Sequence, residues 1–402
     1  MHLELNQDQL QLADTVRRWI GRDYRFDTRR AIVHSDTGVS PAAWATLVEL
    51  GLTALPVPEA YGGFGGDAVD MYAVVQELGR GLVVEPYMAT MLGAEFLRLG
   101  CMHGSPHGDL LARVAAGESR LACALGERQS RHDAFDIATR LEVVDGGYRL
   151  HGEKRVVVHG AEADVLVVSA RAPAPMPASA ADDRYGMDGV TLFALPAGSA
   201  GVRITGYRTL DGLRAANVVL DGAVVGPGAV IGRVGEGGVI LDAALDYGAG
   251  LLCAEALGAM QALFDATLEY LKTRQQFGAP IGKFQALQHK MADMAIHLEQ
   301  ARSMALLAAL TLAHTRTDVN GTGPDGAAVE RRRVVSAAKY RVGLAARFIG
   351  QGAIQLHGGM GVTDELPASH YFKRLSTIEL SLGDMDHHLE RFIAQPGFRE
   401  AA

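Results

Sequence analysis

The sequence predicts a mainly helical α+β protein in three consecutive parts. These are an N-terminal α-helical domain at 1–120, a middle β-domain at 121–232 and a C-terminal helix bundle at 233–402. In the first and last parts apolar residues recur every three or four positions, as in amphipathic helices. The middle part has short apolar runs separated by turn residues, as in a β-domain. A length of 402 residues also suits two or three domains.

The composition is that of a soluble globular protein, with 48% hydrophobic and 21% charged residues. A net charge of -8 argues against a general basic surface for nucleic acid or an anionic membrane. Three cysteines without CxxC spacing (Cys101, Cys123 and Cys253) favour a reducing compartment. The start MHLELNQDQL lacks the pattern of a secretory signal, and no apolar run approaches the length of a membrane span. We therefore expect a cytoplasmic protein.

The N-terminal part begins with a predicted amphipathic helix and contains one glycine-rich segment. Leu10, Leu12, Val16 and Ile20 fall near helical spacing. The segment PEAYGGFGG (58–66) is interpreted as a turn between helices whose glycines take positive φ.

The middle part is predicted to be a set of strands. LEVVDGGYRLHG (141–152) is typical of a hairpin, and further strands are expected at 165–170, 190–195 and 216–226. The Pro-, Ala- and Asp-rich segment 173–189 is expected to be a loop.

The C-terminal part carries two long apolar stripes that predict bundle helices. A loop is expected between them at 317–328. The two stripes are Phe284, Leu287, Met291, Met294, Leu298, Ala301 and Ala305, then Val335, Ala338, Val342, Ala345 and Ile349.

Several motifs in this part resemble those of the acyl-CoA dehydrogenase family. They are RQQFG (274–278), IGKFQALQHKMADM (281–294) and QLHGGMGVTDELPASHYFKR (355–374), with GEGG (235–238) ahead of the first long helix. The resemblance implies an α-helical domain, a β-barrel-like domain and a four-helix bundle. LVVEPY (82–87), LEQARSMA (298–305) and GDMDHHL (383–389) are similar to the small subunit of pimeloyl-CoA dehydrogenase and related heteromeric members.

The resemblance also implies a reaction. In this family a carboxylate removes the α-proton of an acyl-CoA thioester, and the β-hydride passes to N5 of a bound FAD. An electron-transfer flavoprotein then takes the electrons. Each FAD site is built from two subunits: one gives the β-domain wall, the base and the start of the last helix, and its neighbour gives an arginine-phenylalanine motif and a Gln-x-x-Gly-Gly loop.

The neighbour's half of the site is intact in this sequence. An arginine fork suits a pyrophosphate or an adenine edge, and glycines let the backbone approach a dinucleotide closely. By resemblance, the cofactor-binding residues are Arg274, Gln276, Phe277, Gln285, Gln355, Gly358 and Gly359.

The β-domain half departs from the family pattern. Where the family has Thr-Glu-Pro-Gly-x-Gly-Ser, this chain has ALGERQSRHDA (124–134), with Gly126, Arg131 and His132 at the threonine, second glycine and serine. Where the family has Trp-Ile-Thr, it has valines at 156–158. A stacking ring and hydroxyl donors are therefore missing.

The catalytic base is missing from both family positions. Leu382 stands at the usual glutamate, and Gly248 stands at the alternative position in the first long bundle helix. Glu379 and Asp246 lie near these positions and could serve only if the backbone were shifted. Their ordinary interpretation is that of solvated or salt-bridged carboxylates.

Two further acids replace polar residues that contact FAD in the family. Asp384 and Asp386 stand at the usual threonine and glutamine, where they would repel a pyrophosphate. Asp384 also fits a helix N-cap, and with His388 it supplies only two ligands on one helix face, so no metal site is predicted.

These features lead to the hypothesis of one subunit of a heteromeric, α2β2, FAD-dependent acyl-CoA dehydrogenase. A homologous partner would supply the base. Two alternatives stay open: a self-sufficient homotetramer with a displaced base, and a non-catalytic structural subunit. A third and weaker alternative is a flavin mono-oxygenase or oxidase on the same fold. The sequence leaves the acyl group undetermined among dicarboxylyl, cyclic and steroid side-chain thioesters, so lipid or steroid side-chain degradation is the expected setting.

Overall fold

The computed structural model describes residues 4–102, 104, 106–172, 186–316 and 326–396. They form two compact units that do not follow chain order. The first joins Met1–Ala31, Ala68–Val83 and Ala249–Ala402, and the second joins Ile32–Asp67 and Val84–Gly248. The domain boundaries expected from the sequence stay a prediction. The loops expected at 173–189 and 317–328 fall largely outside the described residues.

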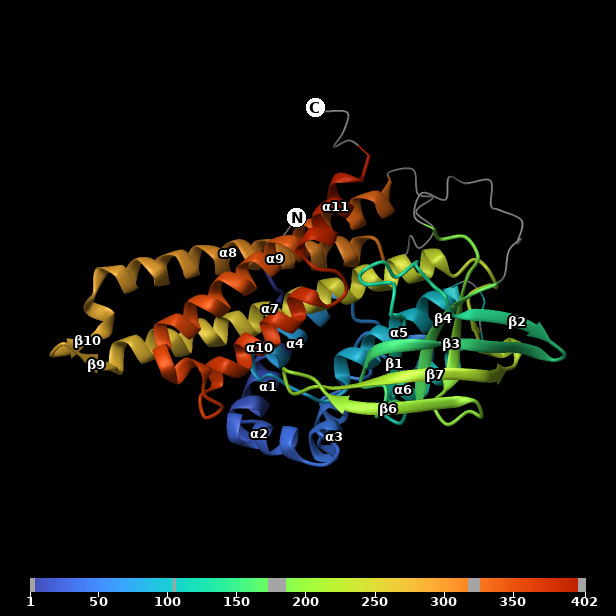
Figure 1. Cartoon of the computed structure of the whole chain (residues 1–402), viewed down its shortest axis with the longest axis horizontal. Coiled ribbons are helices and arrows are strands. Elements are labelled where there is room, and N and C mark those ends of the chain that lie inside the picture. Colours follow the sequence, from blue (N-terminus) through green and yellow to red (C-terminus); the bar gives the residue numbers. More distant parts are fainter. Residues whose placement is uncertain (1–3, 103, 105, 173–185, 317–325, 397–402) are drawn as a thin grey trace. The chain divides into compact units, whose positions relative to one another are not determined.

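The first unit is built from helices (Figure 1). The predicted stripe of the second bundle helix is confirmed from Met291 onward, with Met294 and Leu298 also buried. Phe284, its first predicted member, is 40% exposed and precedes α8. Leu10 is 56% exposed, contrary to its expected place, because α1 buries Ala13, Val16, Trp19 and Ile20 instead. The described helices of the first unit are α1 (Gln7–Asp23), α4 (Ala68–Arg80), α8 (Gln285–His314), α9 (Ala327–His357), α10 (Pro367–Leu380) and α11 (Met385–Ile393). Part of α2 (Phe26–His34) and most of α7 (Gly238–Thr273) also belong to it.

Helices α4 and α7 cross at backbone contact. A Cβ atom on Gly79 would lie 2.1 Å from the carbonyl oxygen of Glu255, and one on Gly258 would lie 1.7 Å from that of Gln76. Only glycine therefore fits at either position. Arg374 of α10 then pairs with the Glu255 carboxylate through two hydrogen bonds of 2.7 Å, which ties α10 to the same stretch of α7.

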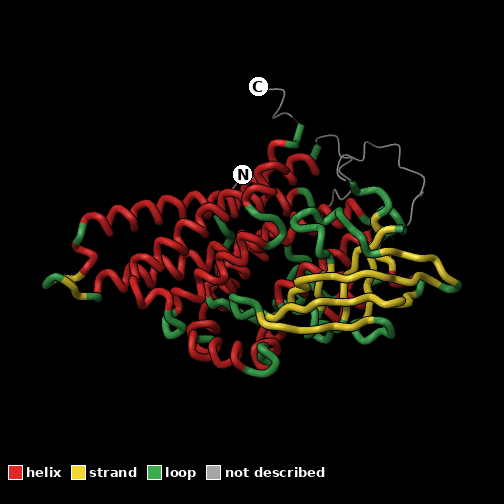
Figure 2. Tube along the Cα trace, in the orientation of Figure 1, coloured by secondary structure: helices red, strands yellow, loops and turns green. Residues whose placement is uncertain are grey.

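The second unit contains the sheet, drawn yellow in Figure 2. The strand order is β6-β7-β3-β2-β4-β5-β8, and β1 pairs with β4 in parallel. The predicted hairpin is confirmed: β2 and β3 are antiparallel, with Val144 opposite Gly147. The strands are β1 (Leu121–Ala124), β2 (Arg140–Val144), β3 (Gly147–Val158), β4 (Val165–Arg171), β5 (Val190–Pro196), β6 (Val202–Arg208), β7 (Arg214–Val225) and β8 (Val230–Ile231).

Helices α3 (Pro41–Glu49), α5 (Tyr87–Met102) and α6 (Gly108–Ala115) complete this unit, and α5 packs against β1. The glycine-rich segment 58–66 forms a turn, as predicted. Gly62 has φ 81°, and a Cβ on Gly63 would lie 2.0 Å from the carbonyl oxygen of Val57.

Helix α7 corrects one expectation from the sequence. At 36 residues it is long and apolar enough to cross a membrane, whereas no such run was expected. However, 67% of its most apolar window is buried inside the protein. This burial is what the core helix of a globular protein shows.

Candidate functional site

A short hairpin arm joins α7 to α8 and displays the predicted arginine-phenylalanine motif (Figure 1). Strands β9 (Gln275–Gln276) and β10 (Ala279–Pro280) pair antiparallel. The turn residues Phe277 and Gly278 both have positive φ, 53° and 74°, as a two-residue type I′ turn requires. Phe277 is 90% exposed, and its ring meets that of Phe284 edge-on at 5.8 Å. The arm therefore presents an aromatic ring to the outside of the chain.

The residues beside this ring are also exposed. Arg274 and Gln276 lie on the arm, and Gln285 is the first residue of α8. The backbone N–H of Ile281 donates to the carbonyl oxygen of Arg274 at 2.9 Å, which closes the base of the arm. These side chains are free to meet a second molecule without unfolding the arm.

The predicted Gln-x-x-Gly-Gly loop forms the end of α9. Gln355 is exposed on the last turn of the helix. Gly358 caps the helix with φ 62° and ψ -144°, a conformation that only glycine adopts readily. Open space surrounds the Cβ positions of Gly358 and Gly359. The backbone is thus bare where a dinucleotide would approach.

The structure brings the arm and this loop to the same end of the helical unit. The ring of Tyr270 on α7 stacks on that of His357 on α9, with centroids 4.5 Å apart. Neither residue was predicted from the sequence. Each lies beside a predicted binding motif, and that position could have drawn attention to it. An exposed guanidinium, an aromatic ring, amides and bare backbone fit a dinucleotide such as FAD.

The junction between α10 and α11 contains the missing base position. Leu382 has φ 53°, so its backbone is left-handed although it is not glycine. The buried Lys339 of α9 donates to the carbonyl oxygens of Ile378, Glu379 and Gly383 at 3.0, 3.0 and 2.8 Å. Burial lowers the pKa of this ammonium to about 8. No acid side chain stands at position 382.

His388 holds the same junction from α11. Its Nε2 donates to the carbonyl oxygen of Leu382 at 2.9 Å, while its buried Nδ1 has no hydrogen-bond partner. Burial, and then the positive charges of Lys339, Arg391 and His387, lower the pKa of His388 well below its ordinary value. The ring is therefore neutral at physiological pH.

Two carboxylates cap the start of α11. Asp384 is the N-cap predicted from the sequence, and its Oδ1 accepts from the N–H of His387 at 2.8 Å. Glu379 accepts from the N–H of Met385 at 3.2 Å. Asp386 adds an exposed acid in the first turn. The N–H groups that could hold an anion at this helix end are thus partly taken by the chain's own acids.

The β-domain segment after β1 is held by a buried ion pair that sequence reasoning missed. Lys154 of β3 donates to Glu127 at 2.7 Å, and also to Ser169 and to the carbonyl oxygen of Leu125. Although burial alone would raise the pKa of Glu127, the Lys154 charge and hydrogen bonds from Gln129, Lys154 and Thr139 lower it to about 2. Burial lowers the pKa of Lys154 to about 8. Lys154 is one of several charged residues in β3, so the sequence did not single it out.

This segment does not fit a flavin as the family's does. The Ser130 hydroxyl is buried and used internally, since it accepts from the N–H of Glu127 and donates to its carbonyl oxygen. Val156 is 61% exposed at φ 52°, in an irregular stretch of the β3–β7 ladder. Arg131 also has positive φ, 44°. Neither Val156 nor Arg131 has an aromatic ring or a hydroxyl that could contact a flavin.

Asp246, the other fallback base, belongs to the second unit, where it is 1% exposed on α7. The structure therefore does not expose it to a substrate.

Among the described residues, no three of His, Cys, Asp and Glu gather as a metal ion would need. Cys253 is fully buried.

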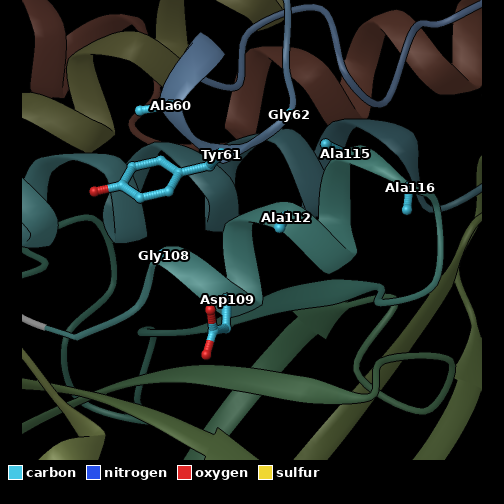
Figure 3. Close-up of a pocket in the computed structure, with 8 residues that line it drawn as sticks. All are labelled: Ala60, Tyr61, Gly62, Gly108, Asp109, Ala112, Ala115 and Ala116. Carbon is cyan, nitrogen blue, oxygen red and sulfur yellow. The ribbon is translucent and has the colours of Figure 1, made fainter.

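A pocket with a volume of about 650 Å³ lies in the second unit. Figure 3 shows the residues that line it. Ala60, Tyr61 and Gly62 face α6 across it, and Asp109 is its one acid. It contains none of the residues predicted for FAD or for proton removal.

Comparison with known proteins identifies the family. The N-terminal, middle and C-terminal domain models of the acyl-CoA dehydrogenases match residues 6–103, 122–222 and 235–395. The mitochondrial isovaleryl-CoA dehydrogenase of Solanum tuberosum is 30% identical over 85% of this chain and 78% of its own length. The chain belongs to the acyl-CoA dehydrogenase family.

Solved structures agree. The ChsE4-ChsE5 complex from Mycobacterium tuberculosis matches with TM-score 0.82 and 25% identity, over 97% of each chain. A variant of the Tcur3481-Tcur3483 steroid ACAD matches with TM-score 0.81 and 27% identity, over 98% of this chain and 99% of that one. The fold is that of FAD-dependent oxidoreductases acting on CH–CH bonds, as the motifs implied.

Proposed function

We propose that this chain is one subunit of a heteromeric, α2β2, FAD-dependent acyl-CoA dehydrogenase. It presents Arg274, Phe277 and the loop 355–359 to an FAD held by a homologous partner, and the partner supplies the base. The observation that carries the proposal is a contrast within the first unit, between the arm and the junction of α10 and α11. The arm is exposed and complete, whereas the α10–α11 junction has Leu382 in place of an acid.

The bound FAD would supply the two-electron oxidation of an acyl-CoA to its α,β-unsaturated product. The chain's own residues would bind and orient it. Arg274 can give a charged hydrogen bond to a phosphate or an adenine edge, and Phe277 can cover an apolar face. Gln355 offers an amide, and the two glycines after it allow close backbone approach.

The junction of α10 and α11 supports a division of labour. Glu379 and Asp384 each accept a hydrogen bond from the start of α11, which supports a capping role for both. Their charges also disfavour an anion there. Two of the compared structures support a heteromeric arrangement, because the name of each joins two proteins. One of these names also describes a steroid enzyme, so a steroid-derived thioester is one candidate substrate.

An electron-transfer flavoprotein is the proposed electron acceptor, and the cytoplasm is the proposed compartment. Neither a nucleic acid nor a membrane is part of the proposed function.

The test is the flavin content of the purified complex with a homologous subunit that carries the family glutamate. We expect one FAD per pair of chains, measured as flavin absorbance against protein mass, and a colourless chain when it is purified alone. One FAD per chain would contradict the division of labour. A yellow, active chain purified alone would instead indicate the self-sufficient homotetramer.

A further inference from the structure

Two ring side chains, Tyr270 and His357, join the two segments that the proposed function assigns to FAD. Their centroids are 4.5 Å apart and their planes are inclined by 27°, so the rings are stacked. The Tyr270 hydroxyl also donates to the carbonyl oxygen of His357, at 3.4 Å. One residue is on the last turns of α7 and the other is the last residue of α9.

Tyr270 is connected directly to the base of the arm. Its carbonyl oxygen accepts from the backbone N–H of Arg274 at 2.8 Å, and the hydroxyl of Thr273 also donates to it, at 3.3 Å. The carbonyl oxygen of Arg274 in turn accepts from Ile281, on the far side of the arm. The backbone of Tyr270 is thus hydrogen-bonded to one end of the hairpin, and that end is hydrogen-bonded to the other.

His357 is connected just as directly to the glycine loop. Its Nδ1 donates to the carbonyl oxygen of Ala353 at 2.9 Å, which fixes the ring against its own helix. The residue is almost fully buried, at 6% exposure. A Cβ on Gly361 would lie 3.0 Å from the His357 Cβ, so the chain after the loop folds back onto this residue.

We infer that Tyr270 and His357 are positioning residues that set the separation between Arg274 and the loop 355–359. The inference rests on the proposed function. Neither residue needs to touch the cofactor. A ligand that bridges two segments binds more tightly when their separation is fixed beforehand, because less freedom is lost on binding.

The experiment uses the complex with the partner subunit and measures the dissociation constant of FAD by flavin fluorescence. Tyr270→Leu removes the stack and the hydroxyl, whereas Tyr270→Phe keeps the stack. The matched control is Phe348→Leu, because Phe348 stacks on His297 at 4.1 Å elsewhere in the same helical unit. Thermal unfolding and the mass of the complex are measured for every variant.

We expect Tyr270→Leu to weaken FAD binding by about two- to tenfold, the range that the loss of one aromatic pair gives. Tyr270→Phe should recover most of the affinity. Phe348→Leu should leave FAD affinity unchanged even where it lowers the unfolding temperature as much as Tyr270→Leu does. Equal FAD affinity in Tyr270→Leu and wild type would overturn the inference.

A second measurement needs neither partner nor FAD. In the isolated full chain, hydrogen exchange should become faster in both 274–281 and 355–361 on Tyr270→Leu, with the middle of α8 unchanged. Unchanged exchange in both segments would overturn the inference even if Tyr270→Leu failed to assemble. Failure of the proposed function gives a different pattern, in which Arg274→Ala itself leaves FAD binding unaffected.

Discussion

At the scale of single residues, the exposure of Arg274 favours a role in binding over a role in folding. It lies on an arm whose backbone is closed by its own hydrogen bonds, so its side chain is not needed to hold the fold. Leu382 is the opposite case. Its left-handed backbone is held by Lys339 and His388, yet its side chain has no group that can take a proton.

Arg274→Ala should lower the FAD content of the assembled complex without disrupting folding. Loss of a charged hydrogen bond to an anion costs about 1.5–3 kcal/mol. Flavin absorbance after serial dilution measures the effect. Lys272→Ala is the control, because Lys272 is an exposed cation two residues earlier on α7. Equal flavin occupancy of Arg274→Ala and wild type across the dilution would remove Arg274 from the site.

At the scale of elements, two buried cations hold segments that the family uses for chemistry. Lys154 holds the strand β3 to the segment after β1 through Glu127, and Lys339 holds the end of α10 to the start of α11. Both segments keep a defined backbone although they depart from the family pattern, with Gly126 in one and Leu382 in the other. The hydrogen bonds of the two lysines are therefore structural.

Glu127→Gln should destabilise the protein by about 3–5 kcal/mol, because it leaves the Lys154 charge buried without its partner. Urea unfolding at neutral pH measures the loss. Glu153→Gln is the control, since Glu153 pairs with Arg155 at 2.7 Å where both side chains are more than a third exposed; we expect a loss of about 0–1 kcal/mol. A loss no larger for Glu127→Gln than for Glu153→Gln would contradict a charged buried pair.

His388 should make the free energy of unfolding depend on pH. Its folded pKa is depressed, so below about 6.5 the unfolded chain binds a proton that the folded chain does not. Stability is therefore complete above that pH and falls as the solution becomes more acidic. His388→Gln should flatten this decline by up to about 1.4 kcal/mol per pH unit, measured by urea unfolding between pH 5 and 7.

The control for this measurement is His289→Gln, which changes an exposed histidine on α8. We expect His289→Gln to keep the slope of wild type. A slope for His388→Gln that matched the wild-type slope would show that His388 titrates in the folded protein as it does in the unfolded chain.

At the scale of the whole molecule, the departures from the family pattern are spread over both units, because Leu382, Asp384 and Asp386 lie in the same helical unit as the arm. The arm and the loop 355–359 belong to the helical unit, whereas the altered segment 124–134 and the valines at 156–158 belong to the unit with the sheet. The departures from the family pattern are thus not confined to one residue.

Leu382→Glu in the isolated chain should not create activity. A base acts only on a substrate held beside a bound flavin, and the β-domain segment offers no free hydroxyl at Ser130 and no ring at Val156. Turnover is measured with an artificial electron acceptor and a panel of acyl-CoA thioesters. Steady turnover by the isolated single variant would show that the base was the only defect.

The sequence alone determined the second bundle helix, the hairpin of the sheet, the family and the motif that the arm carries. Met291, Met294 and Leu298 are spaced by helical geometry, and the hairpin at 141–152 has its turn residues next to its strands, so both signals are local. The motifs at 274–278 and 355–374 are likewise short runs that need no tertiary information to be found.

Only the tertiary structure decided the partners of buried charges and the course of the chain between compact units. Lys154 meets Glu127 across 27 positions, and Lys339 meets Gly383 across 44. The N-terminal part divides between the two units, with α1 in one and α5 in the other. Periodicity reports which face of an element is buried, but not which distant residue it is buried against, because that choice depends on how all the elements pack at once.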